Sequence, residues 1–378
     1  MSSKLKSVAR SLLNRPRRSY DKLSRCSIVI FIALIPTLLV YVGARLSPAF
    51  ADFFNRYISQ ALRFLFAKLT NPLPFSLAEG MLLFSPVLLG LLIAHAIRHR
   101  SSTWKRAGIY LAEVLSGVCV FLILFVWTFG VGYHGTTLDS PEKLDLRRAK
   151  VSANELYETA IILRDHINSE APAVHFREQD FSVMPYSREE MGRRLSEAYD
   201  TVCEQYDFIG NFNSRVKPVM LSEAMSYTHI TGIYSYFTGE ANLNVAFPDY
   251  TLPYTAAHEL AHQRGIARED EANFIAFLVC ISSDDAYIRY SGYLNLYEYV
   301  ASALYRADSE LYYEMLSELD TSVRYELRAY SDFFDKYRDS VASEVSGAVN
   351  DTYLQMQGTQ GTKSYGLVVD LAVAYYKK

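Results

Sequence analysis

Two histidines spaced one helical turn apart are the residues of this sequence with the clearest capacity for chemistry. His258 and His262 are four positions apart, with Glu259 next to the first, in the order H-E-x-x-H. On a helix, side chains at i and i+4 project from one face, so both imidazoles can bind a single metal ion. Glu259 can then reach a water molecule on that metal and act as general base. The spacing therefore predicts a zinc-dependent hydrolase.

The context of the motif favours a helix. A chance match is a roughly one-per-cent event for a chain with 8 histidines among 378 residues. The motif lies in an apolar-patterned stretch that opens near Pro253 and ends at Gly265, whose lack of a Cβ suits a helix C-cap. The alternative is a structural helix in which the two histidines are coincidental.

A catalytic zinc site needs a third protein ligand and an open fourth position. Six residues after His262, where one branch of the zincins has a third histidine, the sequence has Arg268. The acids that follow are therefore the candidates, with Glu269 preferred and Glu271 as the alternative third ligand. Asn273 lies one helical turn after Glu269 and is expected to orient a ligand histidine by a hydrogen bond.

The order H-E-x-x-H at His258, followed by E-x-x-A-N at Glu269, resembles the glutamate-ligand zincins (gluzincins). The whole chain also resembles an uncharacterised family of bacterial membrane proteins, through the segments ITGIYSYFTGEANLN and KSYGLVVDLAVAYY. These resemblances imply a zincin-like α+β domain, Zn²⁺ and the hydrolysis of peptide bonds in a polypeptide substrate. Two features depart from the gluzincin pattern. The gap of seven residues from His262 to Glu269 is short, and Asn273 replaces a more common aspartate.

The same resemblance implies a strand that borders the cleft and pairs with an extended substrate. Residues 239–245 are the candidate edge strand, and an ordinary sheet strand without a ligand is the alternative. A donor that stabilises the transition state is also expected. The sequence leaves four candidates open, namely Tyr234, Tyr236, His229 and Arg264.

A second class of function remains open at this point. The chain could be a non-catalytic sensor or assembly protein of the cell envelope that keeps a zincin fold for binding. The presence of Glu259 favours the peptidase, because a domain that only binds has no need of a general base.

Three long apolar stretches near the start predict transmembrane helices, at about 27–44, 74–97 and 107–131. Each is long enough to span a hydrocarbon core about 30 Å thick. The connection at 45–71 is rich in aromatic and apolar residues and is expected to form a helix that lies in the membrane interface. The lipid bilayer is therefore a predicted partner.

Basic residues next to the spans predict the orientation of the chain. Eight basic residues and one acid precede the first span, and four basic residues lie between 98 and 106. Basic loops resist translocation, so both regions are expected in the cytoplasm. The prediction is a multi-pass protein of the cell membrane. It has a cytoplasmic basic tail (1–26), a membrane domain of three spans and the interfacial helix (27–132), and an extracytoplasmic zincin-like metallopeptidase domain (133–378).

The remaining sequence predicts a mostly α fold with a small β element. Ser152 and Ser187 each precede a glutamate by three residues, as in capping boxes that open helices. Residues 217–247 are rich in β-branched residues and tyrosine, which predicts short strands. Beyond the N-terminal tail there is no broad basic surface, which excludes nucleic acid as a partner. No C-x-x-C pair occurs, which disfavours a zinc site made of cysteines.

Overall fold

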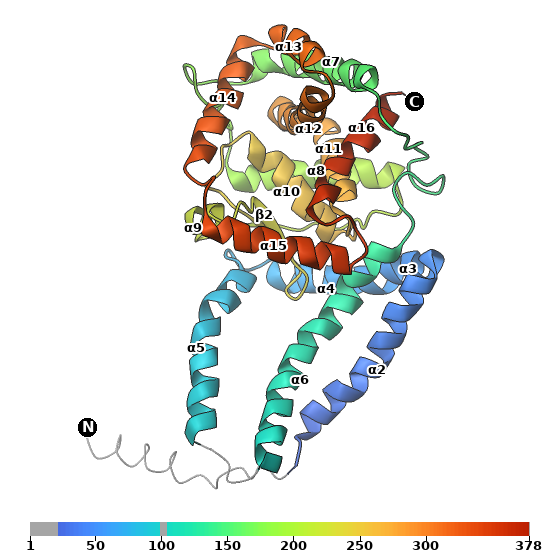
Figure 1. Cartoon of the computed structure of the whole chain (residues 1–378), viewed down its shortest axis with the longest axis vertical. Coiled ribbons are helices and arrows are strands. Elements are labelled where there is room, and N and C mark those ends of the chain that lie inside the picture. Colours follow the sequence, from blue (N-terminus) through green and yellow to red (C-terminus); the bar gives the residue numbers. More distant parts are fainter. Residues whose placement is uncertain (1–21, 99–103, 378) are drawn as a thin grey trace, which may run out of the picture. The chain divides into compact units, whose positions relative to one another are not determined.

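The computed structural model describes residues 22–98 and 104–377. This part of the chain is mostly helical with one three-stranded sheet, as predicted (Figure 1). It forms two compact units. The first contains the described residues up to Leu39 and from Phe84 to Ile123, and the second contains Val40–Leu83 and the chain from Leu124 onward. The predicted basic tail up to residue 21 and Arg100 of the basic loop lie outside the described residues.

Three helices are long and apolar enough to cross a membrane. They are α2 (Arg25–Leu46), α5 (Leu77–Arg98) and α6 (Trp104–Thr128). Most of their apolar side chains are exposed, which is unfavourable in water and typical of helices surrounded by lipid. Within the first unit, Glu113 of α6 accepts a hydrogen bond from Ser24 Oγ at 2.9 Å, just before α2 begins. These helices support membrane association.

The segment predicted to lie in the membrane interface is helical and belongs to the second unit. Helix α3 (Pro48–Phe53) continues through the π-helical η1 (Phe54–Ser59) into α4 (Gln60–Thr70). One side of this segment is buried. The other side exposes bulky apolar residues, namely Phe53, Tyr57, Phe64, Leu65 and Leu69. The predicted helix is confirmed, and its position at a membrane surface remains a prediction.

The segment from α3 to α4 belongs to the second unit. The two units therefore divide the chain differently from the predicted domains at 27–132 and 133–378. Arg63 of α4 is buried and donates hydrogen bonds to the carbonyl of Thr128 at 2.7 Å and to Asn55 Oδ1 at 2.8 Å. Asn55 Nδ2 in turn donates to the carbonyl of Gly265 at 2.9 Å. From the sequence alone, Arg63 would be expected to extend its charged group from an apolar segment toward water. Only its tertiary contacts show that it is buried.

Helices form most of the remaining second unit. Ser152 caps α7 (Ala153–Glu170) in a full capping box with Glu155, and Ser187 caps α8 (Arg188–Gln205). Helix α12 (Ala286–Ala307) packs along α7 in the core. The other elements are α9 (Ser222–Ser226), α10 (Thr251–Gln263), α11 (Glu269–Ile281), α13 (Ser309–Ser317), α14 (Thr321–Asp335), α15 (Val341–Met356), α16 (Val368–Tyr376), and the 3-10 turns η2 (Gly130–His134), η3 (Ala171–Ala173) and η4 (Gly361–Leu367).

The sheet has the strand order β1-β3-β2. Strand β3 (Glu240–Leu243) lies in the middle, parallel to β1 (Val216–Pro218) and antiparallel to β2 (Gly232–Ser235). The prediction that residues 239–245 form an edge strand is therefore wrong. All four residues of β3 are buried and the strand is paired on both sides, a property that depends on tertiary packing. Among the described strands, β2 is an edge strand.

Candidate metal centre

Helix α10 carries the two histidines in the interior of the second unit. All 13 of its residues are buried, including the H-E-x-x-H motif. The rings of His258 and His262 lie with their centroids 4.6 Å apart, as expected for side chains one turn apart on one helix face. The predicted motif helix is therefore confirmed, and packing on every side leaves its histidines little freedom to move.

The end of α10 is a tight turn that depends on Gly265. This residue has φ 102°, a conformation that glycine adopts without steric cost. The N–H groups of Gly265 and Ile266 donate to the carbonyls of His262 and Ala261, at 3.0 and 3.1 Å. This is the Schellman pattern of helix C-termini, so the predicted glycine C-cap is confirmed. The chain reverses at once, and α11 begins at Glu269.

The turn also orients the second histidine. Nδ1 of His262 lies 2.7 Å from the carbonyl oxygen of Ile266, so in the neutral ring the proton is assigned to Nδ1 and the lone pair to Nε2. Nδ1 of His258 is buried and has no hydrogen-bond partner among the described residues. A backbone carbonyl thus supplies, for one ring, the orienting contact that metal-binding histidines usually have.

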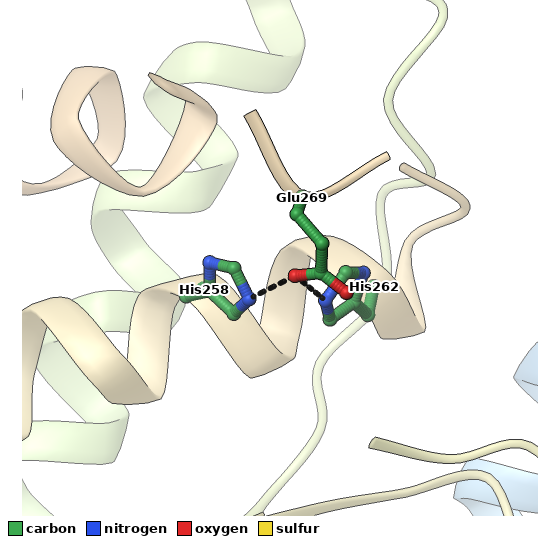
Figure 2. A group of neighbouring side chains, drawn as sticks. All are labelled: His258, His262 and Glu269. Carbon is green, nitrogen blue, oxygen red and sulfur yellow. Dashed lines mark ion pairs between the residues drawn. The ribbon is translucent and has the colours of Figure 1, made fainter. Parts of the chain in front are cut away.

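Glu269 completes a group of three possible ligands. Its Oε2 atom lies 3.2 Å from Nε2 of His258 and 3.3 Å from Nε2 of His262, and Figure 2 shows both rings pointing at this carboxylate. Tetrahedral zinc ligands with bonds of about 2.0–2.1 Å lie roughly 3.3 Å apart, so these separations fit one zinc ion. Among the described residues, this is the group of histidine, cysteine and acidic side chains close enough to share an ion.

The charges within the group are strongly coupled. Burial disfavours the charged forms, but each partner stabilises the other: the imidazoles lower the pKa of Glu269, and Glu269 helps raise the pKa of His262 to about 9. An anionic carboxylate between two imidazole nitrogens is a suitable set of ligands for a divalent cation, which would neutralise the negative charge.

Glu271, the alternative third ligand, lies elsewhere. Its Oε1 accepts hydrogen bonds from the backbone N–H of Leu138 at 3.0 Å and from Arg268 Nη1 at 3.2 Å. Burial raises the pKa of Glu271, and the cations Arg268 and Lys143 oppose this shift. Glu269 thus lies next to the two histidines, whereas Glu271 binds the backbone of the segment that follows η2.

Asn273 does not orient either histidine in this structure. Its Nδ2 lies 3.5 Å from the hydroxyl of Tyr299, and its backbone carbonyl accepts a hydrogen bond from Tyr254 at 3.0 Å. The carbonyl of Ile266 has the orienting role for His262. A backbone carbonyl cannot be identified from residue type, because every residue has one.

Glu259 is buried beside the candidate ligands. It accepts a hydrogen bond from the backbone N–H of Tyr234 in β2, and its Oε2 has no hydrogen-bond partner. A Cβ at Gly232 would lie 2.6 Å from Glu259 Oε1, so the glycine leaves room for the carboxylate. Burial raises the pKa of Glu259, whereas His258 and His262 oppose the shift. The group is therefore suited to hold a proton reversibly.

The four candidate donors occupy other surroundings. Arg264 is buried, donates to the carbonyl of Phe212 at 2.8 Å and stacks on the ring of Tyr199 at 4.0 Å. His229 Nε2 bonds to the carbonyl of Tyr337 at 2.7 Å. The ring of Tyr236 packs on Phe125, and the buried hydroxyl of Tyr234 has Arg63 as its charged neighbour. The hydrogen bonds of Arg264 and His229 are thus to backbone carbonyls away from the candidate ligands.

The charge of Glu269 also acts on four tyrosines that are not among the candidate donors, and one of them is Tyr299 of α12. The other three lie near one another. They are Tyr133 of η2, Tyr353 of α15 and Tyr365 of η4. Burial is the main cause of their raised pKa values, and the charge of Glu269 raises each of them further. Glu259 also raises the pKa of Tyr365. Tyr365 lies in the segment KSYGLVVDLAVAYY, whose resemblance to other proteins was the only available signal.

A family model described as "Protein of unknown function (DUF3810)" matches residues 50–373. The chain belongs to this family. Neither a curated protein nor a solved structure matches the chain. The matched region contains α10, α11, the sheet and η4, and it includes the whole of α5 and α6. The family description assigns no activity, so the chemistry of the centre has to be argued from its residues.

The centre of this DUF3810 protein is almost closed. His258, Glu259, His262 and Glu269 are between 4 and 8% exposed. The ring of Phe129, directly after α6, lies edge-on to His262 with a centroid distance of 5.6 Å. The hydroxyl of Tyr353 donates to that of Tyr133 at 3.2 Å beside it. Aromatic side chains therefore cover the candidate ligands.

Proposed function

We propose that this protein is a membrane-anchored zinc metallopeptidase that hydrolyses peptide bonds in polypeptides. The observation that carries the proposal is the convergence of Nε2 of His258, Nε2 of His262 and Oε2 of Glu269 at the spacing of zinc ligands. A buried carboxylate oxygen without a partner lies beside them on Glu259. Buried polar atoms are rarely left unpaired, which supports a bound ion or water at this position.

In the proposed mechanism, His258, His262 and Glu269 hold the zinc ion and Glu259 moves the proton. A bound zinc ion supplies Lewis acidity, which lowers the pKa of water and polarises a carbonyl group. Glu259 accepts the proton of the attacking water and later donates it to the leaving amine. Its hydrogen bond from Tyr234 holds the carboxylate in place while it does so.

Strand β2 is the proposed binding edge for an extended substrate. In the antiparallel pair with β3, alternate residues of β2 direct their backbone N–H and C=O groups away from β3. Gly232 and Tyr234 are these residues, which agrees with the hydrogen bond from Tyr234 to Glu259. A polypeptide paired beside β2 would therefore pass next to the general base.

The proposed location is the cell membrane, with several spans and the metal centre on the extracytoplasmic side. The three apolar helices support the membrane anchor, and the basic residues before the first span and between the second and third support the orientation. A reporter fused after the last residue tests this orientation. A reporter signal showing that the C-terminus lies in the cytoplasm would contradict it.

The decisive experiment combines metal analysis with one substitution. The purified full-length chain in detergent should contain one zinc per chain and hydrolyse fluorescently labelled casein. Glu259→Gln should keep the zinc and lower the rate by about 10²–10⁴-fold, because it removes only the proton acceptor. His258→Ala should lose the metal. The matched control, His175→Ala, replaces an exposed histidine and should change neither property.

The outcomes separate the peptidase from the alternatives. Folded wild-type chain without metal would overturn both zinc-based functions. Zinc content with no hydrolysis in either the wild type or Glu259→Gln would instead favour a sensor or assembly protein of the cell envelope.

A further inference from the structure

Access to the metal centre requires part of its cover to move. Phe129 and Tyr133 come from the chain directly after α6, whereas Tyr353 and Tyr365 come from α15 and η4. Phe129 is fixed between His262 and Tyr234, with ring centroids 5.6 and 5.3 Å away. A polypeptide cannot reach ligands that are at most 8% exposed unless one side of this cover opens.

Helix α15 is the weakly held side of the cover. Of its 16 residues, Leu354 alone is buried, whereas all 13 residues of α10 are buried. Two glycines with positive φ, Gly358 at 88° and Gly361 at 67°, follow the helix and allow the chain direction to change there. Few buried contacts mean a low free energy of local opening, so α15 is the element of the cover best able to move.

The outward face of α15 is apolar. Val341, Val345 and Val349 follow one another at i, i+4 and i+8, and they are 74, 59 and 65% exposed. Met356, on the same face, is 70% exposed. A contiguous apolar stripe on a helix in water is unfavourable, and such stripes mark surfaces that contact a protein or a membrane.

The position of α15 in the second unit favours a membrane. Tyr353 of α15 packs against Phe125 in the last turn of α6, with ring centroids 6.0 Å apart. Within this unit, α15 therefore packs beside the C-terminal end of an apolar helix. In the same unit, α4 exposes Phe64, Leu65 and Leu69, so two helices present apolar faces, as helices in a membrane interface do.

The charges of α15 indicate how it would contact lipid. The helix contains no lysine or arginine, and its acids are Glu344 and Asp351. Asp351 accepts a hydrogen bond from the backbone N–H of Thr362 at 2.8 Å, within the covering segment itself. Attraction to anionic headgroups is therefore absent, and insertion of apolar side chains is the remaining source of affinity.

We propose that α15 is a lid that docks on the bilayer through its valine stripe, so that the metal centre opens toward the membrane surface. The occupant of the stripe is the lipid of the interface. This inference rests on the proposed function for its second part, the substrate class. The substrates would be polypeptides anchored in the bilayer or emerging from it, because they reach the opened side of the centre first.

Docking can be tested without any catalytic activity. The full-length chain is reconstituted in phosphatidylcholine vesicles with and without brominated acyl chains, which quench tryptophan on contact. Val345→Trp should show quenching beyond that of the wild type with its two tryptophans. The matched control, Tyr313→Trp, is 59% exposed on α13, at the opposite end of the second unit from α15 (Figure 1), and should show none. Equal quenching in both variants would overturn the docking.

The substrate class is tested with one peptide in two forms, free in solution and tethered to vesicle lipid. The wild type should prefer the tethered form. The double substitution Val345→Asn and Val349→Asn should lower cleavage of the tethered peptide several-fold and leave the zinc content unchanged. Tyr313→Asn is the control and should behave as the wild type. A preference that persists in the double variant would contradict a role for α15.

These two experiments distinguish the failure of each proposal. Quenching of Val345→Trp without cleavage of either peptide would keep the membrane-docked lid and reject the peptidase. Cleavage without quenching would keep the peptidase and reject the docked lid. If a second copy of the chain, and not lipid, covers the valine stripe, the docked lid is also rejected.

Discussion

Helices α10 and α15 both contribute side chains around Glu269, but they are held in the fold very differently. Helix α10 is buried on every side, and a Schellman turn fixes its end. Helix α15 buries Leu354 alone and exposes a valine stripe. The difference separates two requirements of a metal centre. Its ligands must be held rigidly, whereas its cover must be able to open.

The largest expected effect distinguishes the two glutamates at the start of α11. Glu269→Gln should reduce zinc from one equivalent per chain to a trace, because a ligand oxygen is lost. Glu271→Gln should retain zinc, since its side chain bonds to Leu138 and Arg268 and not to the histidines. Elemental analysis of both purified variants checks this. Loss of zinc in Glu271→Gln alone would reverse the assignment of the third ligand.

Displacing Glu259, the proposed general base, should have the next largest effect. In Gly232→Ala, the new methyl group would lie within 2.6 Å of Glu259 Oε1 and force the carboxylate away from its place. We expect hydrolysis to fall by about 10²-fold with zinc content unchanged. Gly192→Ala, at a position with open space around its Cβ, serves as the control. Full activity in Gly232→Ala would show that Glu259 tolerates movement.

Two glycines with positive φ test the rigidity of the two regions. Gly265→Ala combines an unfavourable φ with a clash against Arg63, and should cost about 2–4 kcal/mol of stability. Gly358→Ala has a similar φ of 88° but open space around it, so about 1 kcal/mol is expected. Thermal unfolding in detergent measures both. Similar losses would mean that the turn after α10 is not specially constrained.

The smallest expected effect is local. Hydrogen exchange should be faster in the backbone amides of α15 than in those of α10, because opening α15 breaks few buried contacts. Leu354→Ala should accelerate exchange in α15 further and leave α10 unchanged. Equal protection of the two helices would contradict the distinction between fixed ligands and a movable cover.

Much of the candidate site could be predicted from local sequence. The positions of His258 and His262 follow from helix periodicity, and the turn at Gly265 follows from the need for a positive φ. The preference for Glu269 over Glu271 was only a ranking, because a shift of two residues turns a side chain to another face of a helix. The tight turn after Gly265 places the carboxylate of Glu269, and not that of Glu271, next to the two histidines.

Short-range sequence patterns are sufficient to predict the apolar helices, the helix caps and the helix that carries the H-E-x-x-H motif. Long-range packing makes β3 the central strand, buries Arg63 beneath the turn, sets the carbonyl of Ile266 against His262, and brings Tyr133 of η2 and Tyr353 of α15 into contact. These contacts join residues far apart in the chain. Their formation depends on the packing of the whole core, which no local window of sequence contains.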